Sequence, residues 1–287
     1  MAECRACNLC DNPGTPDTSP ESARIASNVR RFHHESFTVW RCTNCRSLHS
    51  LEDADLDHYY KGYLFQSQHL DFHTRLGYRN RLKLLRKHGL TRESRVLDYG
   101  CGNGLFVQFL RGQGYAHVAG FDAYAPQYQD RGVLDHTFDV IVSFDVIEHV
   151  EQPRDFVSEL AGKLRAGGLL VIGTPNAERL SLSFPMALEL HQPYHRHILS
   201  EQALLGLGTR CGLTRVEVVT RHWLDTLIPT ANSRFLWEYV YRAGGLVDAG
   251  LEGPRLGMIA RSPRLWLFAF AGYFVPARGN MIAVFRK

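Results

Sequence analysis

The chain has 287 residues, 45% of them hydrophobic and 22% charged, which is enough for one large globular domain with a small appendage. Its formal net charge of +4 is too small, without a clustered basic patch, to indicate a nucleic-acid partner. No basic segment followed by an apolar one opens the chain, so we expect no secretory signal and a cytoplasmic protein. The longest apolar run, at 265–275, is too short to span a bilayer.

Two C-x-x-C pairs lie near the start of the chain and predict a zinc-ribbon module over residues 1–52. Cys4 is an alternative ligand, but the turn-forming residues that follow Cys10 favour the pair of Cys7 and Cys10. The four predicted ligands are Cys7, Cys10, Cys42 and Cys45. Because a zinc ion held by four thiolates has no open position for water, its role should be structural.

A helical segment is expected over 53–92, and after it short apolar runs alternate with amphipathic stretches. The expected strands are 95–99, 117–122, 138–144, 169–174, 215–219 and 281–286. The expected helices between them are 105–112, 153–165 and 201–211. This succession predicts an α/β fold, with a mostly parallel Rossmann-like sheet and helices on both faces, over 93–287. The remaining segments, 177–198 and 222–278, are expected to form a cap.

Glycines follow the first of these strands at alternate positions, in the stretch DYGCGNG that begins at Asp98. Glycine backbone at the carboxyl end of a parallel strand lets a ligand approach closely. A dinucleotide-binding loop would place a further glycine where this chain has Leu105. S-adenosylmethionine carries no phosphate and suits the acid at the strand end, and Asp122, which ends the next strand, can bind its ribose.

The stretch 96–106 resembles motif I of the class I S-adenosylmethionine-dependent methyltransferases, and the resemblance extends over about 93–215. It is closest to the branch of the ubiquinone-pathway O-methyltransferases. The resemblance implies that the cofactor is bound by Asp98, Gly100, Cys101, Gly102, Gly104, Asp122, Asp145 and Val146. The third strand of that family is short or missing here, since few residues separate Asp122 from Phe138, and no residue is assigned to the adenine.

Methyl transfer to a hydroxyl requires removal of a proton, for which histidine is suited near neutral pH. We predict His149 as this base, with Glu148 beside it, and His195 from the histidine-rich stretch 190–200 as a further catalytic residue. In the ubiquinone-type branch this segment is implicated in binding a divalent ion, which implies a candidate magnesium site at Asp145, Glu148 and His149. The alternative is that His149 only hydrogen-bonds its loop.

The C-terminal cap is aromatic and basic, which predicts either a packed helical core or a peripheral membrane contact through 263–278. The predicted function is methyl transfer to a small-molecule, glycan or lipid-linked acceptor, at oxygen. One alternative is an RNA base methyltransferase, although the near-neutral ribbon argues against RNA docking. The other is a zinc-ribbon interaction protein without catalysis.

Overall fold

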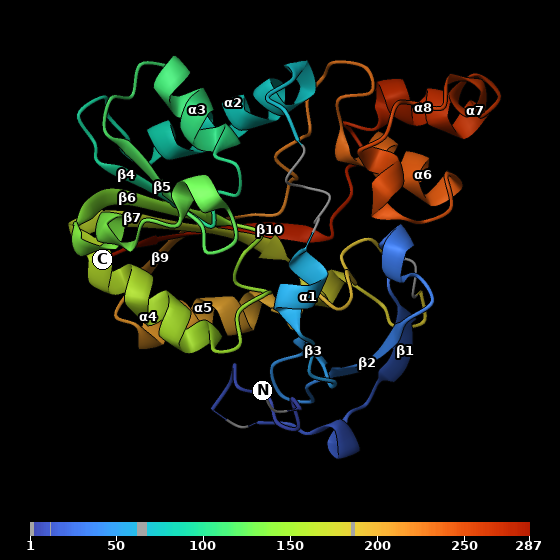
Figure 1. The fold of residues 1–287 in the computed structure, drawn as a ribbon, viewed down its shortest axis with the longest axis horizontal. Coiled ribbons are helices and arrows are strands. Elements are labelled where there is room, and N and C mark those ends of the chain that lie inside the picture. The colour runs from blue at the N-terminus through green and yellow to red at the C-terminus, as the bar shows by residue number, and fades with distance from the viewer. Residues whose placement is uncertain (1–2, 12, 62–67, 185–186) are drawn as a thin grey trace.

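The structure is a computed structural model that describes residues 3–11, 13–61, 68–184 and 187–287. Figure 1 shows three regions: a large α/β body, a small N-terminal module below it, and a group of three helices, α6 to α8, at the upper right. Residues 62–67, which fall within the predicted helical segment 53–92, lie outside the described residues.

The α/β body is built on a six-stranded sheet with the order β5-β4-β6-β7-β10-β9. The strands are β4 (Val96–Tyr99), β5 (Val118–Phe121), β6 (Phe138–Phe144), β7 (Leu164–Pro175), β9 (Thr214–Val219) and β10 (Asn280–Arg286). The pairs β4–β5, β4–β6 and β6–β7 are parallel, whereas β10 runs antiparallel to both β7 and β9. The predicted Rossmann-like α/β fold is confirmed.

The stretch between β5 and β6 contains two 3₁₀ helices and no strand. These are η4 (Pro126–Tyr128) and η5 (Arg131–Asp135). β5 is accordingly an edge strand of the described sheet, next to β4 alone. The expectation that a third strand is missing here is confirmed.

Helices cover both faces of this sheet, with α2 and α3 on one face and α4 and α5 on the other (Figure 1). They are α2 (Phe72–Lys87), α3 (Leu105–Gly112), α4 (Pro153–Lys163) and α5 (Glu201–Arg210). Successive strand residues point to opposite faces, so Val140 and Val142 pack with α2 and α3 while Ile141 packs with α4 and α5. The near-continuous Val and Ile of β6 follows from this burial on both faces.

The N-terminal module shares a sheet with the rest of the chain, in the order β1-β2-β3-β8. Its strands are β1 (Ser22–Ala26), β2 (Ser36–Arg41), β3 (Leu48–Ser50) and β8 (His197–Ile198). The last strand comes from the predicted cap segment 177–198 and pairs with β3. Buried Arg41 adds to this junction by donating to the carbonyl oxygens of Ala177 and Leu180. A short helix, α1 (Leu56–Tyr60), follows the module.

The cap region 222–278 contains α6 (Ser233–Arg242), α7 (Leu256–Ala260) and α8 (Pro263–Ala271). These helices have a small core of their own, in which Phe235 and Tyr239 of α6 meet Leu265 and Phe268 of α8. Among the described residues, no helix has both the length and the apolar character needed to cross a bilayer.

Two glycines of α5 test how tightly this helix packs on β10. A Cβ on Gly208 would lie 2.3 Å from Cε1 of Phe285, whereas a Cβ on Gly206 would meet only the flexible end of Arg210. We expect Gly208→Ala to lower the free energy of unfolding by about 1–3 kcal/mol through overpacking. Gly206→Ala, the matched control, should raise it by about 0.5–1 kcal/mol. Urea denaturation measures both, and equal effects would contradict the packing described here.

Candidate functional site

The glycine loop after β4 has a backbone that only glycine adopts easily. Gly100, Gly102 and Gly104 have φ angles of 80°, 54° and 76°, in the left-handed region. A Cβ on Gly100 would lie 2.1 Å from Cγ2 of Val146, so the loop packs directly against the segment after β6. A Cβ on Gly102 would meet nothing within 4 Å. The loop therefore leaves open space above its central glycine.

The two predicted cofactor-binding acids lie beneath and beside this loop. The carboxylate of Asp122 accepts hydrogen bonds from the backbone amides of Gly102 and Tyr124, each at 2.8 Å. Asp98 is 4% exposed, and its burial raises the pKa of its carboxyl to about 7, against the lowering effect of Arg81. A nearby cation would favour the ionised form of Asp98.

These features fit S-adenosylmethionine. The open space at Gly102 lets a ligand come close to the backbone of the loop. A positive group near Asp98 would offset the desolvation cost of its ionised carboxyl. Cys101 lies half-buried in the same loop, with its sulfur directed at the backbone around Gly120. Assignment of individual cofactor contacts to these residues stays a prediction.

Asp145 and Val146 begin the segment that follows β6, and they point in different directions. Val146 packs on the glycine loop, whereas the side chain of Asp145 is 58% exposed and its Oδ2 lies 3.6 Å from Nη2 of Arg81. Asp145 has a φ of 58°, a left-handed conformation that aspartate tolerates better than most residues. This turn aims its carboxylate at Arg81.

Arg81 is a site residue that the sequence reasoning missed. It is 6% exposed, and its guanidinium lies 3.8 Å from the ring centroid of Phe144 and 4.2 Å from that of Trp223. A guanidinium desolvated over aromatic faces gains cation–π energy and offers its remaining donors to a ligand. The sequence did contain an indication of this residue, because Arg81 is spaced from Tyr78 and Leu85 so that all three share the apolar face of a helix.

A pocket opens at the carboxyl ends of β6 and β7, beside Arg81. Its lining combines the side chains of Asp145 and Thr174 with an apolar and basic wall. The wall residues are Arg81, Phe144, Arg221, His222, Trp223, Met281 and Ile282. The hydroxyl of Thr174 donates to Oε2 of Glu148 at 3.0 Å, so the pocket is connected to the predicted catalytic residues.

The structure brings the three predicted catalytic residues together. Ligand-type atoms of Glu148, His149 and His195 all lie within 4.8 Å of one another, although 46 positions separate His149 from His195 in the chain. Oε1 of Glu148 has no hydrogen-bond partner, and Nε2 of His195 lies 3.9 Å from it. Burial raises the pKa of Glu148 well above its usual range. It lowers the pKa of His149 to about 4 and lowers the pKa of His195 well below its ordinary value.

These shifts favour the uncharged form of all three groups, because burial penalises a charge on each of them. Nδ1 of His195 donates to the carbonyl of Glu189 at 2.7 Å, which leaves Nε2 as the acceptor that faces Glu148. Nδ1 of His149 donates to the carbonyl of Tyr194 at 2.9 Å. This agrees with the alternative interpretation, in which His149 forms a hydrogen bond within the loops. Nε2 of His195 and Oε1 of Glu148 thus face each other at 3.9 Å, which is longer than a hydrogen bond.

The candidate magnesium site at Asp145, Glu148 and His149 is not formed. Asp145 is directed at Arg81 and lies outside the group that Glu148 and His149 make with His195. That group contains two imidazoles and one carboxylate, whereas magnesium prefers oxygen ligands. The described geometry does not support the expected magnesium ligand set, because Asp145 points away from Glu148 and His149 after the turn.

The four predicted thiolate ligands gather in the N-terminal module, within 4.8 Å of one another. The sulfur–sulfur distances are 3.6 Å for Cys7–Cys45, 3.7 Å for Cys7–Cys10 and 3.9 Å for Cys10–Cys42. A tetrahedral zinc site with bonds of about 2.3 Å requires sulfur separations of about 3.8 Å. The geometry fits zinc, and it excludes disulfides, in which the sulfurs lie about 2 Å apart.

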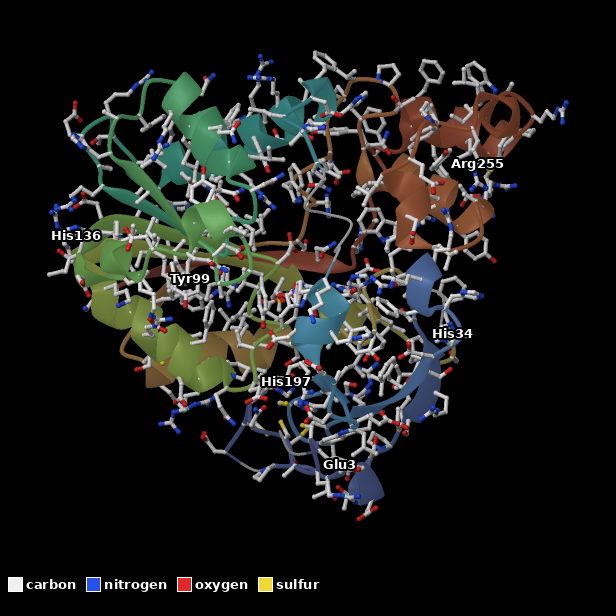
Figure 2. The ribbon with its side chains drawn as sticks, viewed as in Figure 1. Glu3, His34, Tyr99, His136, His197 and Arg255 are labelled. Atoms are coloured by element: carbon white, nitrogen blue, oxygen red, sulfur yellow. The ribbon has the colours of Figure 1, made fainter. Side chains whose placement is uncertain are left out.

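Cys4 is not part of the four-thiol group. It lies instead with His49 and His197, whose Nδ1 atoms are 2.9 Å apart. His197 belongs to β8 and sits at the junction of the module and the α/β body (Figure 2). The backbone amides of Arg196 and His197 both donate to the carbonyl of Glu148. β8 therefore contacts the N-terminal module through its pairing with β3, and it contacts the backbone of Glu148 through these amides.

Comparison with known proteins agrees with this geometry. The profile of a family described as "Methyltransferase domain" matches residues 52–218, more than half of the chain. The chain belongs to this methyltransferase family. At the level of family, the resemblance to methyltransferases is confirmed.

Among curated relatives of this chain, the mitochondrial ubiquinone biosynthesis O-methyltransferase of Schizosaccharomyces pombe is 28% identical over 152 residues, 45% of this chain and 52% of that protein. A tRNA U34 carboxymethyltransferase from Geobacter sp. is 30% identical over 149 residues, 44% of this chain and 46% of that protein. The chain thus spans about half the length of these relatives.

A solved structure shows the same fold at low identity. A chain from the complex between the Haloferax volcanii Trm112 methyltransferase activator and a methyltransferase has a TM-score of 0.51 at 15% identity. The match covers 82% of this chain and 98% of that one.

The pKa of Asp98 predicts how cofactor binding depends on pH. Below pH 7 this carboxyl is protonated in the free protein and must lose its proton to bind a cation. The affinity for S-adenosylmethionine should therefore rise about tenfold between pH 5.5 and 7.0. Isothermal titration calorimetry measures this rise. Asp98→Asn should bind more weakly with no such dependence, and a flat profile for the unaltered protein would contradict this role.

The cysteine geometry predicts a metal-dependent stability. Cys42→Ser should abolish the binding of about one equivalent of zinc and lower the Tm by more than about 5 °C, because the ion's binding energy is folding energy. Metal analysis by mass spectrometry and differential scanning calorimetry measure the two effects. Cys211→Ser, outside the cluster, is the control and should leave both unchanged. Full zinc content in Cys42→Ser would refute the site.

Proposed function

We propose that the protein is an S-adenosylmethionine-dependent methyltransferase that acts at oxygen on a small-molecule, glycan or lipid-linked acceptor. One observation carries the proposal. The glycine loop with Asp98 and Asp122 lies next to a pocket whose Thr174 is hydrogen-bonded to the buried Glu148. A cofactor cradle and a proton-handling cluster thus meet at one edge of the sheet.

When bound, S-adenosylmethionine would supply a methyl group on a sulfonium, ready for in-line displacement. Asp122 holds the central glycine of the loop by accepting a hydrogen bond from the Gly102 amide. Ionised Asp98, which lies beneath the loop, would balance the positive charge of the cofactor. Val146 fixes the glycine loop from the other side. The work of these residues is positioning, which is the larger part of catalysis when the reacting carbon is already activated.

The acceptor hydroxyl must lose its proton as the new carbon–oxygen bond forms. We assign this proton to the cluster of Glu148, His149 and His195, in which neutral imidazoles are available as acceptors at neutral pH. Thr174 provides the connection between the pocket and Glu148. Glu148 and His195 are buried, which limits the access of bulk water to these two groups.

The pocket supports an acceptor with an apolar body and a negative or polar group. Phe144, Trp223 and Ile282 provide apolar walls, and the guanidinium groups of Arg81 and Arg221 provide charge. An enzyme named for ubiquinone biosynthesis, among the relatives, is consistent with acceptors of this kind. In this proposal the zinc is structural, because four thiolates would leave no position open on the ion.

Transfer of a labelled methyl group tests the proposal. The full chain is incubated with methyl-tritiated S-adenosylmethionine and either a small-molecule and lipid extract or purified tRNA. We expect label in the extract, in a product that resists mild base as an ether does. Label in tRNA that ribonuclease releases would establish the RNA alternative. Cofactor binding without transfer to any fraction would indicate the interaction protein without catalysis.

Substitution of the buried carboxyl separates chemistry from binding. Glu148→Gln should lower the rate of transfer by about 10²- to 10⁴-fold because the cluster loses its mobile proton. Its affinity for S-adenosylmethionine should stay unchanged, as measured by calorimetry. Glu151→Gln, at an exposed position in the following loop, is the matched control. An unimpaired Glu148→Gln enzyme would remove the cluster from the mechanism.

A further inference from the structure

Large apolar side chains are exposed together on the outer side of the cap. Phe270 and Phe274 are 61% and 71% exposed, and Trp266 is 50% exposed. We call the set the cap apolar surface, and it comprises Leu227, Ile228, Leu256, Trp266, Leu267, Phe270, Phe274 and Val275. Most of the exposed large apolar side chains among the described residues belong to it. A concentration of exposed apolar side chains in one region of the chain is typical of an interaction site.

Helix α8 is apolar on both of its sides, which explains how this surface arises. Leu265, Phe268 and Ala269 are buried against α6, while Trp266, Leu267 and Phe270 lie on the opposite side and are exposed. The loop that carries Leu227 and Ile228 lies alongside, because the amide of Thr230 donates to the carbonyl of Ala269. In Figure 1, α7 and α8 form the outer edge of the molecule.

The charge around the cap apolar surface is mainly positive. Arg264 and Arg255 are paired with Glu238 and Glu252, whereas Arg261 and Arg278 form no ion pair among the described residues. The segment 253–287 contains no acidic residue. Arg261, Arg264 and Arg278 are exposed there, and Arg255 lies at the outer edge of the cap (Figure 2). Aromatic side chains bordered by arginines are typical of proteins that lie on the headgroup region of an anionic bilayer. A second copy of the chain fits less well, because two arginine-bordered surfaces would repel each other.

The cap apolar surface is also connected to the acceptor pocket. Arg221 lines the pocket, and its Nη1 donates to the carbonyl of Tyr273 at 2.8 Å. The same guanidinium lies 4.4 Å from the ring centroid of Tyr273, which precedes the exposed Phe274. A single arginine thus forms part of the pocket wall and of the support of the apolar surface.

We propose that the cap apolar surface docks on an anionic lipid bilayer and brings the acceptor pocket to the membrane, where a lipid-linked acceptor enters it. The membrane contact stands on the exposure and charge of the cap alone. The identity of the pocket as the acceptor site rests on the proposed function. Docking buries the exposed aromatic side chains, while the arginines meet lipid phosphates.

Vesicle co-sedimentation of the full chain tests the proposal. Vesicles of phosphatidylcholine mixed with phosphatidylglycerol should bind the protein, and vesicles of phosphatidylcholine alone should bind it much more weakly. Phe270→Asp combined with Phe274→Asp should weaken binding by at least about tenfold, because two exposed rings no longer enter the bilayer. Arg261→Glu with Arg278→Glu should abolish the preference for the anionic lipid.

The matched control is Val216→Asp, an exposed apolar position on the edge strand β9. It should bind vesicles as the unaltered protein does. Calorimetry with S-adenosylmethionine on each variant shows whether the fold and the cradle are intact, so loss of docking is distinguished from failure of the proposed function. Absence of binding to both kinds of vesicle would overturn the proposal. A dimer in light scattering that the aspartate variant dissociates, with no vesicle binding, would assign the surface to self-association instead.

Discussion

The hydrogen bond from the Gly102 amide to the Asp122 carboxylate is the contact on which the site depends. It joins the loop after β4 to the end of β5. In this loop, three glycines at alternate positions have the left-handed conformation that other residues rarely adopt. Val146 closes the other side of the same loop. Through Val146, the loop also contacts the segment that contains Asp145 and Glu148.

The sheet and its glycine loop could be predicted from the sequence because their signals are local. Val and Ile runs buried on both faces mark β6, and a glycine that needs positive φ marks the loop. β7 is longer than expected because its first residues, Arg-Ala-Gly-Gly after Leu164, carry no strand pattern. β8 was not expected at all, since two residues are too few to produce a periodicity.

The site was predictable only in part, because some of its contacts join distant segments. His195 was named as a candidate, but its position beside Glu148 follows from the pairing of β8 with β3. The backbone turn at Asp145 was not visible, and it removed that residue from the expected ligand set. Arg81 was overlooked because a charged residue on the apolar face of a helix contradicts the pattern used to find the core. Such local contradictions are expected at functional positions.

The sharing of β8 between the two parts of the molecule has an evolutionary consequence. Many small metal-binding modules fold alone and are exchanged between proteins as independent units. Here the host domain contributes the last strand of the module's sheet, and two of the carbonyl oxygens that accept from Arg41 lie in the host as well. Removal of the module would leave the edge of β8 unpaired. It would also leave the carbonyl oxygens of Ala177 and Leu180 without the guanidinium that donates to them. The junction therefore couples the two parts structurally, so a change on one side of it constrains the residues that fit on the other.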